Sequence, residues 1–193
     1  AWRYRRERQA QLLETSRLRA ELAEAQLHSL KSQLHPHFLF NSLNAVATLA
    51  TTDPPTARRV VLVLSGLLRR ALSDADAREV PLAQEVEFVR AYLEIEQIRF
   101  SHRLSVTISI DAGVERMLVP PFVLQPLVEN AVRHGIEPKA EPGSIRIEAG
   151  FEAGFVADGV RLAVIDDGVG ASQVSRRQGA GVGLANVRAR LAR

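Results

Sequence analysis

Residues 33–44 have the sequence QLHPHFLFNSLN, in which a proline separates two histidines and a dense apolar run follows. Proline lacks the backbone N–H of a helix interior and clashes with the carbonyl four residues back, so a helix must bend or restart at Pro36. If the helix continues beyond it, His37 and Asn41 lie one turn apart on the same face. Neutral imidazole is a competent nucleophile, and its free pKa is about 6.5. His37 is therefore a candidate nucleophile with an amide beside it.

Two other roles for these histidines stay open at this point. His37 could be an ordinary packed or solvated residue of an amphipathic helix. His35 and His37 could instead be metal ligands, although the chain has no cysteine and no second histidine pair at ligand spacing. The local pattern does not decide among these roles.

The flanking sequence predicts a helical hairpin. Residues from about 5 to 34 lack glycine and proline, and their apolar residues recur at three-to-four spacing, which predicts an exposed helix that needs a partner. Beyond Pro36 the helix is expected to run to about Ala50, the chain reverses at 51–55, and a second apolar helix covers about 56–72. Two such helices bury little alone, so we expect two copies to form a dimeric four-helix bundle from residues 1–72.

Residues 73–80 form a polar segment that is a candidate linker, with a second domain expected at 81–193. A helix is expected directly after Pro81, because apolar residues recur there at helical spacing. Four glutamates, at positions 85, 87, 94 and 96, are expected to lie largely off its apolar stripe.

Beyond Ser101 the hydrophobic period changes from helical to alternating, which predicts strands with one buried face. Strands are expected at 104–110, 145–149 and 160–164, with a helix from Pro120-Pro121 to about His134 between the first two. A last helix is expected from about Gly183. This order predicts an α+β chain, with an N-terminal helical hairpin followed by an α/β sandwich whose helices cover one face of the sheet.

The composition excludes several classes of protein. The net charge of +3 is modest and the basic residues are spread without interleaved aromatics, so no nucleic-acid surface is expected. A membrane-spanning helix needs a run of about 18 apolar residues, and this sequence contains no such run. The absence of cysteine suits a reducing cytoplasm. Trp2 and Tyr4 beside clustered arginines are typical of the cytoplasmic flank of a membrane helix, or simply of a basic helix end, and we expect a cytoplasmic fragment.

The segment LVENAVRHG, residues 127–135, carries a first set of polar groups in the second half of the chain. Asn130 and His134 lie one turn apart on a half-buried helix face, where an amide is costly unless it has a partner. Its oxygen could bind a hard cation such as Mg²⁺. Glu129 stands next to it and could act as a base, or it could pair with Arg133 one turn on.

Two glycine-rich segments follow. In VIDDGVG, residues 164–170, a strand ends in Asp166, whose carboxylate can accept a hydrogen bond from an exocyclic amine such as adenine's. The glycines allow a close backbone approach, although Asp-Gly is also a common turn. GAGVGLAN, residues 179–186, enters a helix and could present N–H groups to phosphate. It matches neither the dinucleotide fingerprint nor the P-loop.

Taken together and in order, these segments resemble the LytS-like sensor histidine kinases of bacterial two-component systems, within the GHKL ATPase superfamily. The resemblance runs from about Leu27 to Leu191. It implies that His37 is the phosphoacceptor, that Asn41 assists phosphoryl chemistry, that Asn130 binds Mg²⁺ and that Glu129 is a candidate base. The nucleotide-binding residues that it implies are Asn130, His134, Asp166, Gly168, Gly170, Gly181, Gly183, Leu184 and Asn186.

The resemblance also implies ATP and Mg²⁺ as cofactors, a homodimer, and a response-regulator receiver domain as partner. Residues 1–72 would be the signalling, dimerisation and phosphotransfer helices of a fragment on the cytoplasmic side of the bacterial inner membrane, without its upstream sensor. Asp167 stands where many relatives have asparagine, which we expect to be harmless. Relatives continue beyond Arg193 through a further strand. The alternatives are a GHKL-type ATPase or serine kinase, or a degenerate dimerisation module in which His37 is structural.

Overall fold

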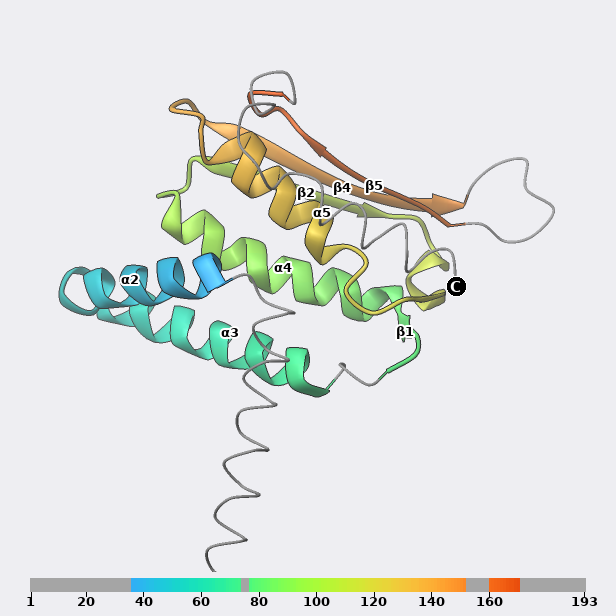
Figure 1. The fold of residues 1–193 in the computed structure, drawn as a ribbon, viewed down its shortest axis with the longest axis horizontal. Coiled ribbons are helices and arrows are strands. Elements are labelled where there is room, and N and C mark those ends of the chain that lie inside the picture. The colour runs from blue at the N-terminus through green and yellow to red at the C-terminus, as the bar shows by residue number, and fades with distance from the viewer. Residues whose placement is uncertain (1–35, 74–76, 152–159, 171–193) are drawn as a thin grey trace, which may run out of the picture.

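The computed structural model describes residues 36–73, 77–151 and 160–170 (Figure 1). Helices α2 (Pro36–Thr52) and α3 (Pro54–Ser73) form an antiparallel hairpin beside helix α4 (Leu82–Arg99), and a sheet lies on the other side of α4. The predicted hairpin is therefore confirmed. The helix expected before residue 35, the glycine-rich segment 179–186 and the last helix lie outside the described residues.

A single residue, Asp53, connects α2 to α3 where the chain reverses direction. Its side-chain Oδ1 accepts a hydrogen bond from the backbone N–H of Thr56 at 3.2 Å, which caps the start of α3. Hydrogen bonds from Thr56 lower the pKa of the Asp53 carboxyl. Pro54 follows at the first helical position, where its missing N–H is not needed. The turn therefore forms where the sequence predicts it and is tighter than expected.

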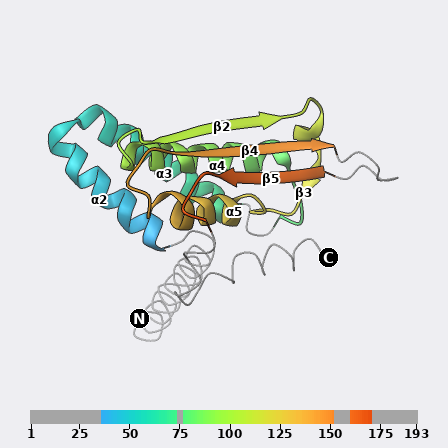
Figure 2. The same ribbon diagram turned by 90° about the horizontal axis from the view of Figure 1, so that it is seen from above.

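The sheet contains strands β2 (Leu104–Ile110), β4 (Gly143–Phe151) and β5 (Val160–Asp166), in the order β2-β4-β5. Strands β2 and β4 are parallel, whereas β4 and β5 are antiparallel. Figure 2 shows the three strands side by side, with the helices on one face. The one-sided arrangement expected from the alternating pattern is thus confirmed. Ile145 and Ile147 are fully buried beneath the sheet.

Short elements complete the described part of the second half. Strands β1 (Val80–Pro81) and β3 (Leu118–Val119) pair in antiparallel fashion, and the single turn η2 (Val114–Arg116) precedes β3. Helix α5 (Gln125–Asn130) continues directly into a π-helical segment, η3 (Ala131–Ile136).

The expectation that a helix starts at Pro120-Pro121 was wrong by about four residues. Phe122 adopts a left-handed backbone with φ of 58°, which a helix cannot include. The buried carboxylate of Glu85 on α4 accepts hydrogen bonds from the backbone N–H groups of Phe122, at 2.6 Å, and Leu124, at 3.1 Å. These contacts satisfy the loop backbone without helix formation and fix the point at which α5 begins.

The hairpin and α4 share one hydrophobic core. Val60, Leu64 and Leu67 of α3 belong to the same buried cluster as Val89 and Leu93 of α4. Two ion pairs also join these helices, Arg59 with Glu94 at 2.6 Å and Arg70 with Glu87 at 2.5 Å. The linker assigned at 73–80 therefore connects helices that pack against each other, and the division at that linker stays a prediction.

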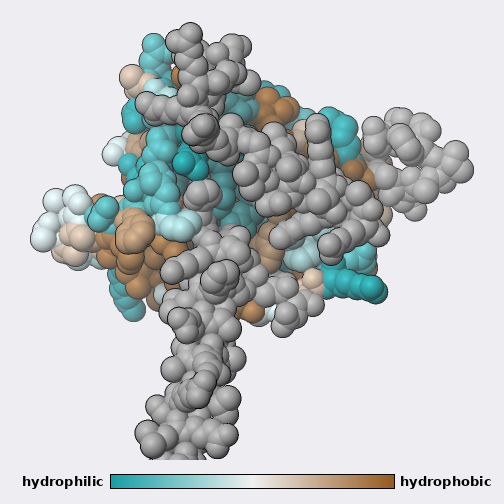
Figure 3. Space-filling view, in the orientation of Figure 1, coloured by the Kyte–Doolittle hydropathy of each residue, from teal (hydrophilic) through white to brown (hydrophobic). Residues whose placement is uncertain are grey.

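Apolar side chains also cover the outer surface of the hairpin. Phe40 is 69% exposed, Leu62 is 62% exposed and Leu43 is 55% exposed. Figure 3 shows apolar surface, in brown, gathered over the hairpin. Within the described ranges, no helix combines the length and apolar character that crossing a lipid bilayer requires.

Candidate active site

His37 lies in the first turn of α2, and its side chain is exposed. The amide nitrogen of Asn41 lies 3.3 Å from Nδ1 and 3.2 Å from Nε2 of the imidazole. A neutral ring has one protonated and one accepting nitrogen, so the amide donates to the unprotonated one. The structure thus brings these two residues into the i, i+4 contact that the sequence predicts.

A buried aromatic contact fixes the first turn of α2 against α4. The Phe38 ring is 3% exposed, and its centroid lies 4.6 Å from that of Tyr92. The Ser42 hydroxyl donates a 2.7 Å hydrogen bond to the Phe38 carbonyl. Burial raises the pKa of the Tyr92 hydroxyl, so this side chain stays neutral. Because Phe38 points into the core, the adjacent His37 is held at the surface.

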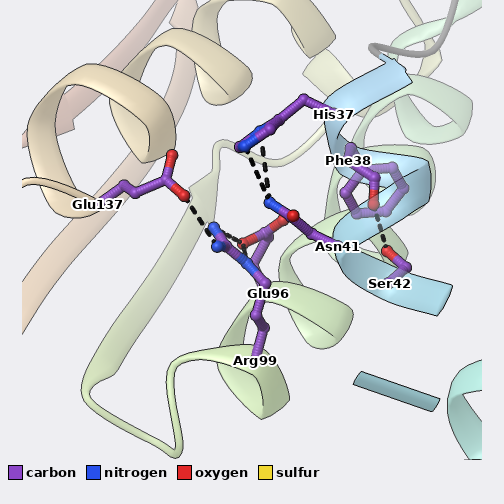
Figure 4. Close-up of polar contacts among 7 residues, drawn as sticks. All are labelled: His37, Phe38, Asn41, Ser42, Glu96, Arg99 and Glu137. Carbon is purple, nitrogen blue, oxygen red and sulfur yellow. Dashed lines mark hydrogen bonds and ion pairs between the residues drawn. The ribbon is translucent and has the colours of Figure 1, made fainter. Parts of the chain in front are cut away.

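A charged cluster lies beside His37 and Asn41 (Figure 4). The Arg99 guanidinium binds Glu96 at 2.7 Å and Glu137 at 2.9 Å. Burial raises the pKa of Glu96, although Arg99 opposes this effect, and the two carboxylates raise the pKa of Arg99 despite its own burial. The sequence does not predict this cluster: Glu96 is expected to lie off the apolar stripe of α4, whereas its side chain is 2% exposed. Glu85, at 5%, contradicts the same expectation.

The helix that bears Asn130 meets the turn after β5. The Val169 N–H donates to the Gly135 carbonyl at 3.3 Å. A Cβ on Gly168 would collide with the Gly135 backbone, and a Cβ on Gly135 would collide with the Asp166 carboxylate. The glycine at 168 therefore serves a close approach between two protein backbones, where the sequence suggested an approach to a ligand. Two of the three predicted nucleotide-binding segments are in contact.

Asp166 is exposed at the end of β5. Its Oδ1 accepts the Gly168 N–H at 2.9 Å, and its Oδ2 has no partner among the described residues. Gly170 has a left-handed backbone with φ of 76°, which a residue without Cβ adopts readily. The carboxylate is thus held by its own turn with one oxygen available to a ligand.

Asp167 fastens this turn to the start of β4. It accepts hydrogen bonds from the Ser144 N–H at 2.8 Å and the Ser144 hydroxyl at 2.9 Å, and it pairs with Lys139 at 3.1 Å. The Ser144 N–H and Lys139 hold the pKa of the Asp167 carboxyl below its usual value. An asparagine could keep one acceptor contact with Ser144 but would lose the ion pair with Lys139.

Three other predicted residues lie on the α5–η3 helix. Asn130 and His134 are half-buried, and their side chains make no hydrogen bond to any described residue. Glu129 accepts a hydrogen bond from the Gln125 amide at 2.8 Å. Gly181, Gly183, Leu184 and Asn186 lie outside the described residues.

Comparison with known proteins decides the family. The Histidine kinase family model matches residues 25–104, and the model of the histidine kinase-, DNA gyrase B- and HSP90-like ATPases matches residues 121–193. The sensor protein LytS of Bacillus cereus is 37% identical over 180 residues, which are 88% of this chain and 30% of that protein. The chain belongs to the LytS-like histidine kinases.

Other histidine kinases are similar to this one. The sensor histidine kinase BtsS of Escherichia coli is 36% identical over 175 residues, covering 90% of this chain and 30% of that protein. A solved histidine kinase domain from the blue-light activated kinase of Erythrobacter litoralis aligns with 90% of this chain and 83% of its own, at 18% identity and a TM-score of 0.45. This histidine kinase chain spans about 30% of the length of the curated relatives named here.

The donor set of this histidine kinase fits one magnesium ion held mainly by phosphate. In the described ranges, no three acidic, histidine or cysteine side chains gather into a metal site. Asn130 offers an amide oxygen, and Mg²⁺ accepts one or two protein oxygens together with phosphate oxygens and water.

Proposed function

We propose that the chain is the kinase portion of a sensor histidine kinase, which transfers the γ-phosphoryl group of ATP to His37 and passes it to an aspartate of a response-regulator receiver domain. One observation carries the proposal. An exposed histidine, in contact with Asn41, stands on the same chain as a helix and a turn that meet at Gly135 and Gly168, and we assign the polar groups of that helix and turn to a nucleotide.

Nucleotide binding is assigned to the groups that the described structure leaves available. Asp166 Oδ2 would accept a hydrogen bond from the adenine amine, since Oδ1 is already engaged by Gly168. His134 lies on the same helix as Asn130, near the triphosphate in this assignment. The phosphate-side contacts are assigned to Gly181, Gly183, Leu184 and Asn186, because the sequence predicts a helix start there and the N–H groups of a helix start suit an anion.

The transfer itself depends on positioning and charge neutralisation more than on covalent chemistry from the protein. The lone pair of the unprotonated nitrogen of His37 forms the N–P bond, while the bond from the γ-phosphorus to the bridging oxygen breaks and ADP departs with that oxygen. The ring proton then passes to solvent or to a carboxylate, for which Glu129 is the candidate. Asn41 must release the attacking nitrogen first. Mg²⁺, when bound, would neutralise charge on the phosphates at Asn130.

The apolar outer surface of the hairpin supports a homodimer. Phe40, Leu43 and Leu62 expose more than half of their surfaces, and a second hairpin would cover them in a four-helix bundle. The relatives are sensor proteins about three times as long. Trp2 and Tyr4 beside clustered arginines suit the cytoplasmic flank of a membrane helix, and on that ground we place the chain on the cytoplasmic side of the bacterial inner membrane, downstream of a sensor region.

The proposal is tested by incubating the chain with ATP labelled at the γ-phosphorus. The expected label is acid-labile and alkali-stable, and it is absent from His37→Gln. His102→Asn is the matched control, because His102 is an exposed histidine at φ of 63°, a backbone that asparagine tolerates. Label that persists in His37→Gln, or that is alkali-labile, would favour a serine kinase. Failure to bind a nucleotide analogue would favour a dimerisation module.

A further inference from the structure

The charged cluster beside His37 contains two carboxylates and one guanidinium. Glu96 and Glu137 share the single guanidinium of Arg99, so the three side chains sum to one negative charge. The two partners differ in their surroundings, because Glu96 is 2% exposed and Glu137 is 31% exposed. We infer that the ion pair of Arg99 with the buried Glu96 is permanent, whereas its ion pair with the more exposed Glu137 can be exchanged.

The packing of α2 against α4 places this cluster next to the candidate phosphoacceptor. The two helices run in the same direction from the contact between Phe38 and Tyr92 (Figure 1). Asn41 lies three residues beyond Phe38, and Arg99 lies seven beyond Tyr92 with its side chain turned back to Glu96. In Figure 4 the His37 ring, the Asn41 amide and the Arg99 guanidinium point toward one another.

We propose that Arg99 binds the phosphoryl group on His37, exchanging Glu137 for it. The inference rests on the proposed function, because it needs phosphorylation of His37. Arg99 Nε and Nη2 both contact Oε2 of Glu96 at 2.7 Å, whereas only Nη1 contacts Glu137, at 2.9 Å. The edge held by Glu96 orients the guanidinium, and the other edge meets the incoming anion.

Chemistry favours this exchange. A phosphoryl group carries more negative charge than a carboxylate and offers three acceptor oxygens, which a guanidinium binds in a planar fork. Glu137 directly follows the π-helical segment η3. Release of Glu137 from Arg99 would therefore remove the ion pair that connects the end of the Asn130-bearing helix to α4.

The test compares three variants for the amount of phosphohistidine formed from labelled ATP and its half-life after ATP removal. Arg99→Lys keeps the charge that Glu96 needs but lacks the fork, so we expect about a tenfold loss of phosphohistidine. Glu137→Gln removes the competing carboxylate, so we expect about a threefold gain. Arg146→Gln is the control, because it removes an exposed arginine from the outer face of the sheet.

The opposite changes in phosphohistidine expected for Arg99→Lys and Glu137→Gln distinguish phosphoryl binding from a structural ion pair. If the cluster only holds α4 to the helix end, both Arg99→Lys and Glu137→Gln will lower the label and the midpoint of thermal unfolding. That result, or a Glu137→Gln variant without a gain, would overturn the inference while leaving His37 as the phosphoacceptor. A wild type that binds a nucleotide analogue but acquires no label on His37 would overturn the proposed function, and this inference with it.

Discussion

The backbone of Gly135, near the end of the helix that bears Asn130, lies so close to Gly168 that no Cβ fits between them. This contact joins an amide-bearing helix to an aspartate-bearing turn that comes about thirty residues later in the chain. The position of Asn130 relative to Asp166 thus depends on the close approach of Gly135 and Gly168.

Gly168→Ala is expected to separate the helix from the turn. Forcing an atom into a packed contact costs about 1–3 kcal/mol, and the displaced Asp166 should bind a fluorescent ATP analogue more weakly. Thermal unfolding and analogue titration measure the two effects. Gly66→Ala is the matched control, since nothing lies within 4 Å of a Cβ there, and it should stabilise α3 by up to about 1 kcal/mol. Equal analogue affinity in wild type and Gly168→Ala would contradict the assignment.

Glu85→Gln should destabilise the loop before α5. The Glu85 carboxylate accepts two backbone N–H groups in a buried site, and an amide has only one oxygen to replace it. We expect a loss of about 2–3 kcal/mol in the free energy of unfolding by denaturant, the range for a buried donor that loses a charged acceptor. Glu87→Gln, on the same helix with a side chain 60% exposed, should change stability by less than about 1 kcal/mol. A similar loss in both variants would show that Glu85 has no special role.

The pH dependence of stability should report on Glu96. Burial raises the pKa of this carboxyl in the folded state above the usual value of 4.5, so the folded protein binds a proton more readily than the unfolded chain. The cost of the buried charge is fully present above the folded pKa and is relieved as pH falls through it toward 4.5. As pH falls through that interval, the free energy of unfolding of the wild type should rise relative to that of Glu96→Gln, by at most about 1.4 kcal/mol per pH unit. A stability difference that does not vary with pH would contradict this assignment.

Phe40→Asp should weaken self-association without unfolding the monomer. The Phe40 ring is 69% exposed, so its loss costs little within one chain, whereas a charge there would be costly in an apolar interface. Sedimentation should show a dimer for the wild type and a shift toward monomer for the variant. Phe38→Ala, two residues earlier on the same helix and buried, should instead unfold the hairpin, at a cost of about 3–5 kcal/mol. An unchanged dimer in Phe40→Asp would place the interface elsewhere.

Much of the fold could be predicted from the sequence because its signals are local. The Asp53-Pro54 pair marks the junction of α2 and α3, and the alternation from Leu104 to Ile110 marks a strand. The start of α5 could not be predicted, since it depends on Glu85, a side chain 37 residues before Phe122. The π-helical segment after Asn130 leaves no signal in the hydrophobic period either.

The candidate site was predictable to a similar extent. The contact of His37 with Asn41 follows from helical spacing. The cluster of Glu96, Arg99 and Glu137 could not be predicted from spacing, because it is assembled from two elements that only the packing of α4 brings together. A glutamate on a helix is usually solvated, whereas the structure shows Glu96 to be 2% exposed beside the partly buried Arg99.

The phosphoacceptor role of His37 is tested most directly by locating the phosphoryl group after incubation with ATP and Mg²⁺, using mass spectrometry under alkaline conditions that preserve phosphohistidine. We expect a single modified residue, His37, and no modification in a sample given a non-hydrolysable ATP analogue. A phosphoryl group on any other residue, or an unmodified His37 in a chain that binds ATP, would contradict this role.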